Sequence, residues 1–513
     1  MFTENKINEI ISLAVQKEGL EIISVYPGSL QKTGDSYYIM IKTLAGRTLF
    51  CFGSARNKKL HGDAVTVKSD GEKLVVQICP CNHENADALR QLFPWTAPRY
   101  IGAQPSFGAG DRLGLAAAGH IRALKKYRIA PVLAQQSVRE MTRTLRSADE
   151  VLDDVTWGVF QEGYTGGYGA DADHIKSEED LRNLVAAGFT GFTIDPSAHL
   201  NPAADTMDIS ALPAALAELF DEEQEISEFL DKYSAQDILV KGKTHSFTLF
   251  INDVAVTRLA IKYLPAIRHT IKCFYIIKQV FGNDPFDFEM SVDETESPTT
   301  AAAHYIIANE LVAAGVKLTS LAPRFPGEFQ KAIDYIGDLY EFRAALADHA
   351  AIAERFGGYK ISIHSGSDKF SIFAAVHELT GGYFHEKTAG TSYLEALRVI
   401  CRFDKSLFRD IVKYALKSFA KERSSYHVTT DLTKIADVNK LADSDLETLL
   451  SENNARQVLH ITYGAILTAK DKDEEYRFRN HLLGVLDEHE EDHYEILNKL
   501  ICAHLDALQV DKK

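Results

Sequence analysis

The N-terminal part of the chain combines one helical pattern with several short strand-like runs. Apolar residues recur at helical spacing over residues 5–19, which predicts an amphipathic helix. Short β-rich runs follow, and turn residues such as Pro27 and Gly28 separate them. The pattern predicts a small N-terminal α+β domain with an antiparallel sheet over residues 1–92. It shows no cluster of chemically active side chains, so we expect a role in packing or oligomerisation.

From about residue 98 onward, short apolar runs alternate with helical stretches. This alternation is typical of parallel strands joined by crossover helices. We place eight candidate strands, over residues 99–104, 130–136, 166–171, 189–195, 286–292, 316–322, 359–365 and 382–388. Eight such units predict an α/β fold, a (β/α)8 TIM-like barrel over residues 93–400, with an open doubly wound sheet as the alternative.

Two helical segments are added to this pattern. A helical insertion at about residues 205–282 separates the fourth and fifth candidate strands. The tail, residues 401–513, is mostly helical and includes an acidic run, so we expect a C-terminal helical extension packed on the barrel. The sequence therefore predicts three parts: a small sheet domain, a catalytic barrel and a helical extension.

Composition restricts the partners of this chain. Its 513 residues carry 72 acidic and 56 basic side chains, a formal net charge of −16, which disfavours a phosphate-backbone partner. The N-terminus lacks the apolar core of a signal peptide, and no apolar stretch is long enough for a membrane span. The six scattered cysteines are typical of reduced thiols. We expect a cytoplasmic protein with a small-molecule substrate and no nucleic-acid or membrane partner; whether it forms a homo-oligomer stays open.

Polar side chains gather where the predicted barrel strands end. Active sites of such barrels form at the carboxyl ends of the strands. A purely structural barrel gains nothing from charge buried there, because desolvation of an unpaired ion costs several kcal/mol. We therefore expect an enzyme.

Four residues at different strand ends are candidate ligands of a divalent metal ion: His174, Glu294, His364 and His385. Imidazole and carboxylate groups together suit Zn, Mn, Ni or Co. His364 and His385 follow adjacent strands, and we expect them at matching depth. Alternatively, each histidine is only a hydrogen-bond partner, and Glu289, on the other face of its strand, is a rival ligand to Glu294.

Other strand ends suggest acid–base and anion-binding groups. Asp171 and Asp173 share a strand face, and paired carboxylates push one pKa upward; alternatively, they cap a following helix. Small-residue segments after the seventh and eighth strands precede helices, where an anionic or polyhydroxy group can bind unless Ser367 and Thr391 are ordinary N-caps. The one glycine-rich run departs from the dinucleotide fingerprint, and no G-x-S-x-G occurs.

Ordered phrases at these strand ends are specific together, although each is weak alone. They include YGADADHIK (168–176), FEMSVDETESPT (288–299), YKISIHSGSDKFSIF (359–373) and HEKTAGTSYLEALR (385–398), and the whole set spans about residues 95–430. In this order the chain resembles the tagaturonate epimerase family, which interconverts D-tagaturonate and D-fructuronate, some relatives acting on D-tagatose and D-fructose. The resemblance implies a divalent-metal-dependent sugar epimerase, an isomerase.

The carbon inverted in this reaction lies β to the ketone, so proton removal next to the carbonyl does not reach it. Retro-aldol cleavage with re-addition, or transient oxidation, would reach it, with the metal ion as Lewis acid. Our hypothesis assigns acid–base work to Asp173 and Asp293 beside Asp171, oxyanion stabilisation to Lys387, carboxylate binding to Arg112, Arg139 or Lys369, and hydroxyl binding to Gln135, Gln136, Ser365 and Thr391.

Alternative functions come from other classes. A metal-dependent class II aldolase would share the retro-aldol step and release the fragments, and another sugar-acid isomerase would share the polar pocket. A non-enzymatic sugar-binding protein would keep the pocket without metal or turnover. Measuring bound metal in purified protein separates the last of these from the enzymes.

Overall fold

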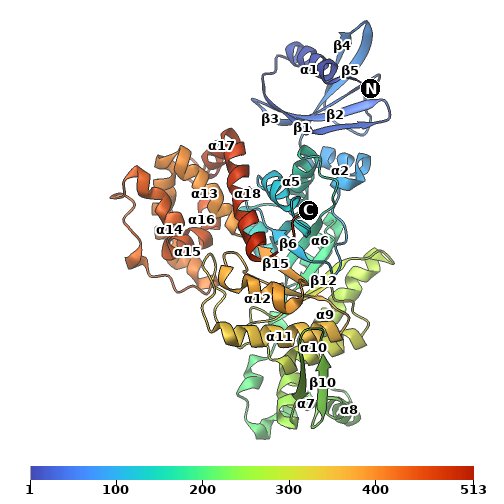
Figure 1. The fold of residues 1–513 in the computed structure, drawn as a ribbon, viewed down its shortest axis with the longest axis vertical. Helices are drawn as coiled ribbons and strands as arrows, with labels where there is room; N and C mark the ends of the chain where they lie inside the picture. Colours follow the sequence, from blue (N-terminus) through green and yellow to red (C-terminus); the bar gives the residue numbers. More distant parts are fainter. Residues whose placement is uncertain (1) are drawn as a thin grey trace.

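The computed structural model describes residues 2–513 and shows a central barrel with added structure on three sides (Figure 1). An antiparallel sheet lies at one end of the long axis, a helical insertion with a hairpin lies at the other, and the C-terminal helices lie beside the barrel. Within these residues, no helix is both long and apolar enough to cross a membrane.

The N-terminal sheet has five antiparallel strands in the order β1-β2-β3-β5-β4. Their bounds are Ile22–Thr33, Ser36–Thr43, Gly46–Gly53, Asp63–Ser69 and Glu72–Pro80 for β1 to β5. Helix α1 (Glu4–Glu18) covers one face, because Ile7, Ile10 and Ile11 lie on one side of it and pack with Phe50 of the sheet. The helix and the five strands confirm the pattern read from the sequence.

The barrel is closed and consists of eight parallel strands in the order β12-β13-β14-β15-β6-β7-β8-β9. The strands are β6 (Ser106–Ala109), β7 (Ala130–Ser137), β8 (Gly169–Ile175), β9 (Gly191–Ile194), β12 (Asp287–Ser291), β13 (Ser320–Ala322), β14 (Lys360–Ile363) and β15 (Phe384–Thr388). This closed barrel confirms the predicted TIM-like fold and excludes the open sheet.

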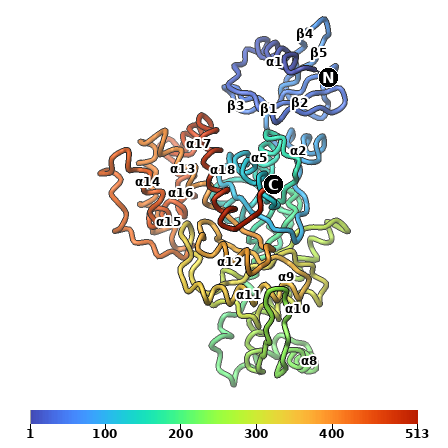
Figure 2. Tube along the Cα trace, in the orientation of Figure 1, coloured from blue at the N-terminus to red at the C-terminus, as the bar shows by residue number. Residues whose placement is uncertain are grey.

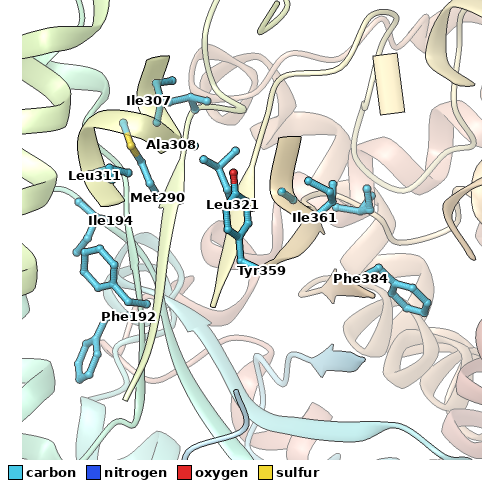
Figure 3. Packing of buried hydrophobic residues seen from close by; sticks show 14 of the residues in the cluster. Phe192, Ile194, Met290, Ile307, Ala308, Leu311, Leu321, Tyr359, Ile361 and Phe384 are labelled. Atoms are coloured by element: carbon cyan, nitrogen blue, oxygen red, sulfur yellow. The ribbon is translucent and has the colours of Figure 1, made fainter. Parts of the chain in front are cut away.

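Helix α2 precedes the first barrel strand, and the other helices around the barrel lie between its strands in the sequence. Their bounds are α2 (His83–Leu92), α3 (Ala117–Leu124), α4 (Val138–Thr144), α5 (Ala148–Gln161), α6 (Glu178–Ala187), α9 (Asp253–Phe281), α10 (Ala301–Ala313), α11 (Leu339–Arg355) and α12 (Phe370–Thr380). Apolar strand residues such as Phe192, Met290 and Leu321 point outward and pack with Ile307 and Leu311 of α10 (Figure 3). The main apolar core therefore lies between the strands and the helices.

The first barrel strand is not where the sequence predicts it. Residues 99–104 are irregular, and the strand is β6 (Ser106–Ala109), on the other side of Pro105. Gly102 has a left-handed φ of 73°, and its N–H and that of Ile101 donate to the Asp287 carboxylate at 2.8 and 2.7 Å. The glycine and the proline end the extended run. The segment therefore does not form a strand, and its backbone N–H groups instead bind the Asp287 side chain at the start of β12.

The insertion is not purely helical, which corrects the sequence expectation. It contains α7 (Leu212–Ala217), α8 (Glu223–Tyr233) and the hairpin of β10 (Asp237–Lys241) and β11 (Ser246–Phe250). Residues 237–241 and 246–250 alternate buried or half-buried with exposed side chains, a strand period that the sequence analysis overlooked. The 29-residue helix α9 then serves as the crossover to β12.

The C-terminal residues form a second helical core beside the barrel. Their helices are α13 (Thr391–Phe403), α14 (Lys405–Glu422), α15 (Asn453–Ile461), α16 (Tyr463–Thr468), α17 (Arg479–Glu488) and α18 (Glu490–Ala507). Leu394, Ile411, Leu459 and Leu482 belong to this core, and α18 returns to pack against α3 (Figure 2). The mostly helical tail is confirmed.

Candidate functional site

A hollow of about 530 Å³ opens at the carboxyl ends of the barrel strands. Its lining joins acidic, basic and imidazole side chains: Arg139, Asp293, Glu294, Thr295, Glu296, Pro323, Arg324, Phe325, Glu328, Phe329, Lys331, His364, Ser365, Ser425, Tyr426 and His427. A smaller recess of about 40 Å³ shares Arg139, Lys331, His364, Ser365 and Tyr426 with it and is also lined by Asp173, His174 and Lys387. The hollow therefore adjoins a recess among buried charges.

The buried ammonium group of Lys387 stands at the centre of these charges. Its Nζ lies 2.8 Å from Asp171 and 2.9 Å from both Asp173 and Glu289. It also donates a hydrogen bond of 2.7 Å to Thr193. Burial alone would lower the pKa of Lys387, but the three carboxylates raise it well above its usual value. Lys387 is therefore a fixed positive charge.

Asp173, His174 and His364 form a group that can hold a cation. One ligand atom of each lies within 4.8 Å of the others. His174 Nδ1 lies 3.0 Å from Asp173, and His364 Nδ1 lies 3.2 Å from Asp293, yet neither nitrogen makes a well-aligned hydrogen bond. Two buried imidazole nitrogens without a hydrogen-bond partner suit metal coordination.

The charge around this group favours a cation as well. Burial would lower the pKa of His174, but Asp173 raises it well above its usual value. Burial likewise opposes charge on His364, but the Asp293 carboxylate raises its pKa to about 9. Both shifts show that the carboxylates stabilise positive charge here, which either protons or a divalent ion can supply.

The backbone at two of these positions is unusual. His174 has a φ of 54° and Ser365 a φ of 53°, in the left-handed region that non-glycine residues rarely occupy. His174 lies in β8 where the pairing with β9 shifts register between Ala172 and Ile175. Such a bulge redirects a side chain at a strand end, and rare backbone conformations often cluster at active sites.

Glu294 lies on the outer side of His174. His174, Asp195 and Glu294 form a second group of possible ligands. Lys176 already places its ammonium 3.1 Å from Asp195 and 3.3 Å from Glu294. The outer group therefore has a resident cation, and the inner group with Asp173 and His364 is the better metal site.

The expected matching depth of His364 and His385 is wrong. In the β14–β15 pairing, His385 lies opposite Ser362, so His364 lies two residues nearer the carboxyl end. Two strand residues correspond to roughly 7 Å. His385 Nδ1 instead contacts Ser106 Oγ at 2.9 Å, and it belongs to neither group of possible ligands. Its depth removes it from the ligand set that we carry forward.

Two residues that the sequence analysis assigned to carboxylate binding already use their side-chain N–H groups in contacts within the protein. The buried Lys369 Nζ donates to the backbone carbonyls of Gln330 (2.8 Å), Ile333 (2.5 Å) and Ser367 (3.3 Å). Arg112 pairs with Glu140 at 2.8 Å, and its guanidinium lies 3.7 Å from the Tyr463 ring centroid. Neither has the open donors that a substrate carboxylate requires.

The remaining assigned residues divide between the cavities and the protein interior. Arg139 and Ser365 line both cavities, and Asp293 lines the hollow. Gln135 donates to Asp171 at 3.1 Å, and Gln136 donates to Glu140 at 3.2 Å. These two amides and the buried Thr391 do not line the hollow or the recess.

Sequence reasoning missed part of the wall of the hollow. Lys331 lies on the long loop after β13, where the polar and aromatic segment 323–331 was the available signal. Tyr426 and His427 come from the C-terminal part of the chain. Nothing in the local sequence indicates that residues so distant along the chain return to the mouth of the barrel.

Comparisons with known proteins agree over almost the whole chain. A model of a family described as tagaturonate epimerase matches residues 26–508. A tagaturonate/fructuronate epimerase of Thermotoga maritima is 42% identical over 490 residues, covering 94% of this chain and 97% of that protein. A glycerol-complexed crystal structure of fructuronate-tagaturonate epimerase from Cohnella laeviribosi, 40% identical, superposes with a TM-score of 0.90, covering 99% of this chain and 100% of that one. The native structure of the same enzyme gives a TM-score of 0.89.

Proposed function

The chain belongs to the tagaturonate epimerase family, and from this we propose that it interconverts D-tagaturonate and D-fructuronate with a divalent metal ion. The relatives named above are epimerases, so the chain is an enzyme of the isomerase type. We extend the proposal to slower conversion of D-tagatose and D-fructose, because these sugars differ from the uronates only at the carbon that carries the acid group.

The metal part of the proposal is carried by one observation, the convergence of Asp173, His174 and His364. Their ligand atoms lie within 4.8 Å, and both histidines have a buried Nδ1 without a well-aligned hydrogen bond. Zn, Mn, Ni and Co all accept this mixture of imidazole and carboxylate. When bound there, a divalent ion would supply Lewis-acid polarisation of the substrate ketone.

Two carboxylates around this position are placed to move a proton at a β-hydroxyl group. Burial opposes their charge, but His174 beside Asp173 and His364 beside Asp293 hold the pKa of both carboxyls well below the usual value. The upward shift expected from pairing Asp171 with Asp173 is therefore wrong for Asp173.

Asp173 and Asp293 lie on different strand ends and both face His174. We propose that one of them accepts the hydroxyl proton and that the other returns a proton on the opposite face. Lys387, 2.9 Å from Asp173, keeps a positive charge beside the oxygen on which negative charge develops.

For the bond changes we propose retro-aldol cleavage and re-addition. Loss of the β-hydroxyl proton turns that oxygen into an aldehyde, the bond between the α- and β-carbons breaks, and its electron pair passes into an enediolate. Rotation of the aldehyde exposes its other face, and the reverse steps restore the bond with inverted configuration. No external oxidant is required.

A time course of NMR spectra tests the proposed function. Purified protein reconstituted with metal is mixed with D-tagaturonate and, in parallel, with D-tagatose, and each mixture is repeated with EDTA. We expect D-fructuronate to form, more slowly D-fructose, and EDTA to abolish both. Conversion that persists in EDTA would refute the metal requirement, and the absence of any conversion with metal bound would refute the epimerase proposal.

Separate replacements test the two acid–base groups. Asp173→Asn and Asp293→Asn keep the side-chain volume and remove the ionisable oxygen. We expect each to lower kcat by 10²-fold or more, about the contribution of a general acid or base. Because Asp173 is also a proposed metal ligand, bound metal is measured in both variants. Activity near that of the wild type in both would remove these assignments.

We also propose that residues 401–513 work with the barrel of residues 93–400, leaving residues 1–92 as a separate small domain. Ser425, Tyr426 and His427 complete the wall of the hollow from outside the barrel. The C-terminal extension therefore contributes to the substrate site, whereas the N-terminal sheet does not line it.

A further inference from the structure

Two basic side chains of the hollow lack an acidic partner. Arg324 and Lys331 lie on the loop between β13 and α11 and line the hollow. Lys331 Nζ donates to the Ser365 hydroxyl at 2.5 Å, and Arg324 Nε is buried without a hydrogen-bond partner. Neither forms an ion pair within residues 2–513. A half-buried cation without a partner is costly unless something negatively charged binds beside it.

The other cations at this opening are already paired. Arg139 lies 3.5 Å from Glu294, with its guanidinium over the Tyr426 ring. His427 lies 2.7 Å from Glu328. Among the residues that line the hollow, Arg324 and Lys331 are therefore the basic side chains that no carboxylate of residues 2–513 pairs, although acidic residues also line it.

A keto-uronate carries, on its carboxylate, the negative charge that Arg324 and Lys331 lack. Its ketone and its carboxylate lie at opposite ends, and a single carbon separates the carboxylate from the carbon that is inverted. Ser365, the partner of Lys331, directly follows His364, a proposed metal ligand. An acid group held by Lys331 would therefore place the reacting carbon near His364 and Asp293.

Resting on the proposed function, we propose that Lys331 and Arg324 bind the substrate carboxylate and determine the preference for a uronate over a neutral ketohexose. A charge-assisted pair of this kind strengthens binding of the charged substrate alone. The pair also holds the aldehyde fragment, which carries the acid group, while its carbonyl turns between cleavage and re-addition.

The loop that carries Lys331 is held firmly from two sides. Lys369 donates to the carbonyls of Gln330 and Ile333, on either side of Lys331. Arg456 of α15 donates to the Ala332 carbonyl at 2.9 Å and pairs with Asp368 at 2.7 Å. Lys369, which the sequence suggested as a substrate contact, is thus a positioning residue for Lys331, and the ammonium is pre-arranged for its ligand.

Kinetics of matched variants test this assignment. Lys331→Met removes the charge and keeps much of the chain length, Lys331→Arg keeps the charge, and Arg324→Met provides an independent second variant. Lys317→Met is the control, since Lys317 is exposed and outside the hollow. For each protein, KM and kcat are measured with D-tagaturonate, together with KM for D-tagatose, or its Ki as a competitive inhibitor if turnover is too slow.

We expect Lys331→Met and Arg324→Met to raise KM for D-tagaturonate about 10- to 100-fold, the loss of one charge-assisted hydrogen bond. The KM or Ki for D-tagatose should stay unchanged. Lys331→Arg should keep most of the wild-type affinity for D-tagaturonate. An equal loss for both sugars, or an unchanged KM for D-tagaturonate, would overturn the assignment. If the wild type converts neither sugar, the proposed function fails by itself. Calorimetry with D-fructuronate and D-fructose then tests the carboxylate site alone, and equal affinity for the two sugars would refute it.

Discussion

The two faces of the barrel strands follow opposite chemical rules. Outward residues such as Phe192, Met290 and Leu321 are apolar and pack against helices (Figure 3). The residues between them point inward and are polar: Ser106, Asp171, Thr193, Glu289, Ser320, Lys360, His385 and Lys387. Barrels of this class commonly fill the interior with branched apolar side chains. Stability is therefore concentrated outside the strands, and charge that the reaction can use is held inside them.

The interior charges are connected across most of the barrel. Near its amino end, Lys360 donates to the Gly102 carbonyl at 2.8 Å and to Ser106 at 2.9 Å. Ser106 contacts His385, while Glu289 accepts from Ser320 at 2.5 Å and contacts His364 at 2.6 Å. Each of these charged groups thus has at least one hydrogen-bond partner, which limits the desolvation cost of an interior without an apolar filling.

The largest effect is expected from breaking the interior network at its centre. Lys387→Met leaves Asp171, Asp173 and Glu289 without their shared ammonium. We expect a loss of about 3–5 kcal/mol in the free energy of unfolding and a fall of 10²-fold or more in kcat. Denaturant titration and initial rates measure the two effects, with Lys317→Met as the control. Unchanged stability would mean that these carboxylates do not depend on Lys387.

Truncating an apolar side chain on the outer face of the strands should lower stability without affecting catalysis. Leu321→Ala removes a fully buried side chain between β13 and the helices. We expect it to lower the free energy of unfolding by about 2–5 kcal/mol and to leave kcat and KM of the folded protein unchanged. A large loss of kcat together with normal stability would contradict the division between the two faces.

A buried pair of histidines in the outer layer should make it sensitive to acid. His304 and His349 are buried between α10 and α11 with their Nδ1 atoms 2.9 Å apart, and burial lowers the pKa of His349 to about 4. Because its folded pKa lies below the unfolded value, stability is present above about pH 6.5 and is lost as the pH falls toward 4, by about 3 kcal/mol.

Replacing His349 should remove part of this slope. We expect His349→Gln to weaken the dependence of unfolding free energy on pH between 6.5 and 4, measured by denaturant titration at several pH values. His61→Gln, at an exposed position, is the matched control. An unchanged slope in His349→Gln would assign the acid sensitivity to other groups.

The smallest expected effect comes from an interior hydroxyl. Ser320→Ala removes one donor to Glu289 and leaves Lys387 and His364 beside that carboxylate. We expect a loss of about 1–2 kcal/mol in unfolding free energy and retained activity. A loss as large as that of Lys387→Met would show that the network acts as one unit rather than through its central charge.

The alternation of apolar runs and helical stretches was sufficient to predict the closed barrel, because local sequence determines that alternation. The first strand failed where Gly102 and Pro105 interrupt an apolar run, and the hairpin at residues 237–250 was hidden in a longer helical stretch. The candidate site was predicted in part: His174, His364, Asp173 and Lys387 converge. How deep a side chain such as that of His385 lies in the barrel depends on the register between neighbouring strands, and the local sequence does not determine that register.

Local sequence patterns could not predict which residues distant along the chain meet at the hollow. Lys331 was missed because its loop has no strand signal, and Tyr426 because it comes from another helical layer. Lys369 and Arg112 were assigned to the substrate because a basic residue after a strand resembles an anion clamp. Their donors are used by backbone carbonyls and by Glu140, contacts that only the three-dimensional structure reveals.

The left-handed backbone at His174 affects how variant libraries of this protein should be built. Alanine or a branched residue at position 174 would change the main chain as well as remove the imidazole, so a dead variant could not distinguish the two causes. Asparagine, aspartate and glycine tolerate this conformation. Asparagine is therefore the informative replacement, because it removes the imidazole and keeps this backbone conformation, whereas most other residues add a cost of about 1–2 kcal/mol at this point of β8.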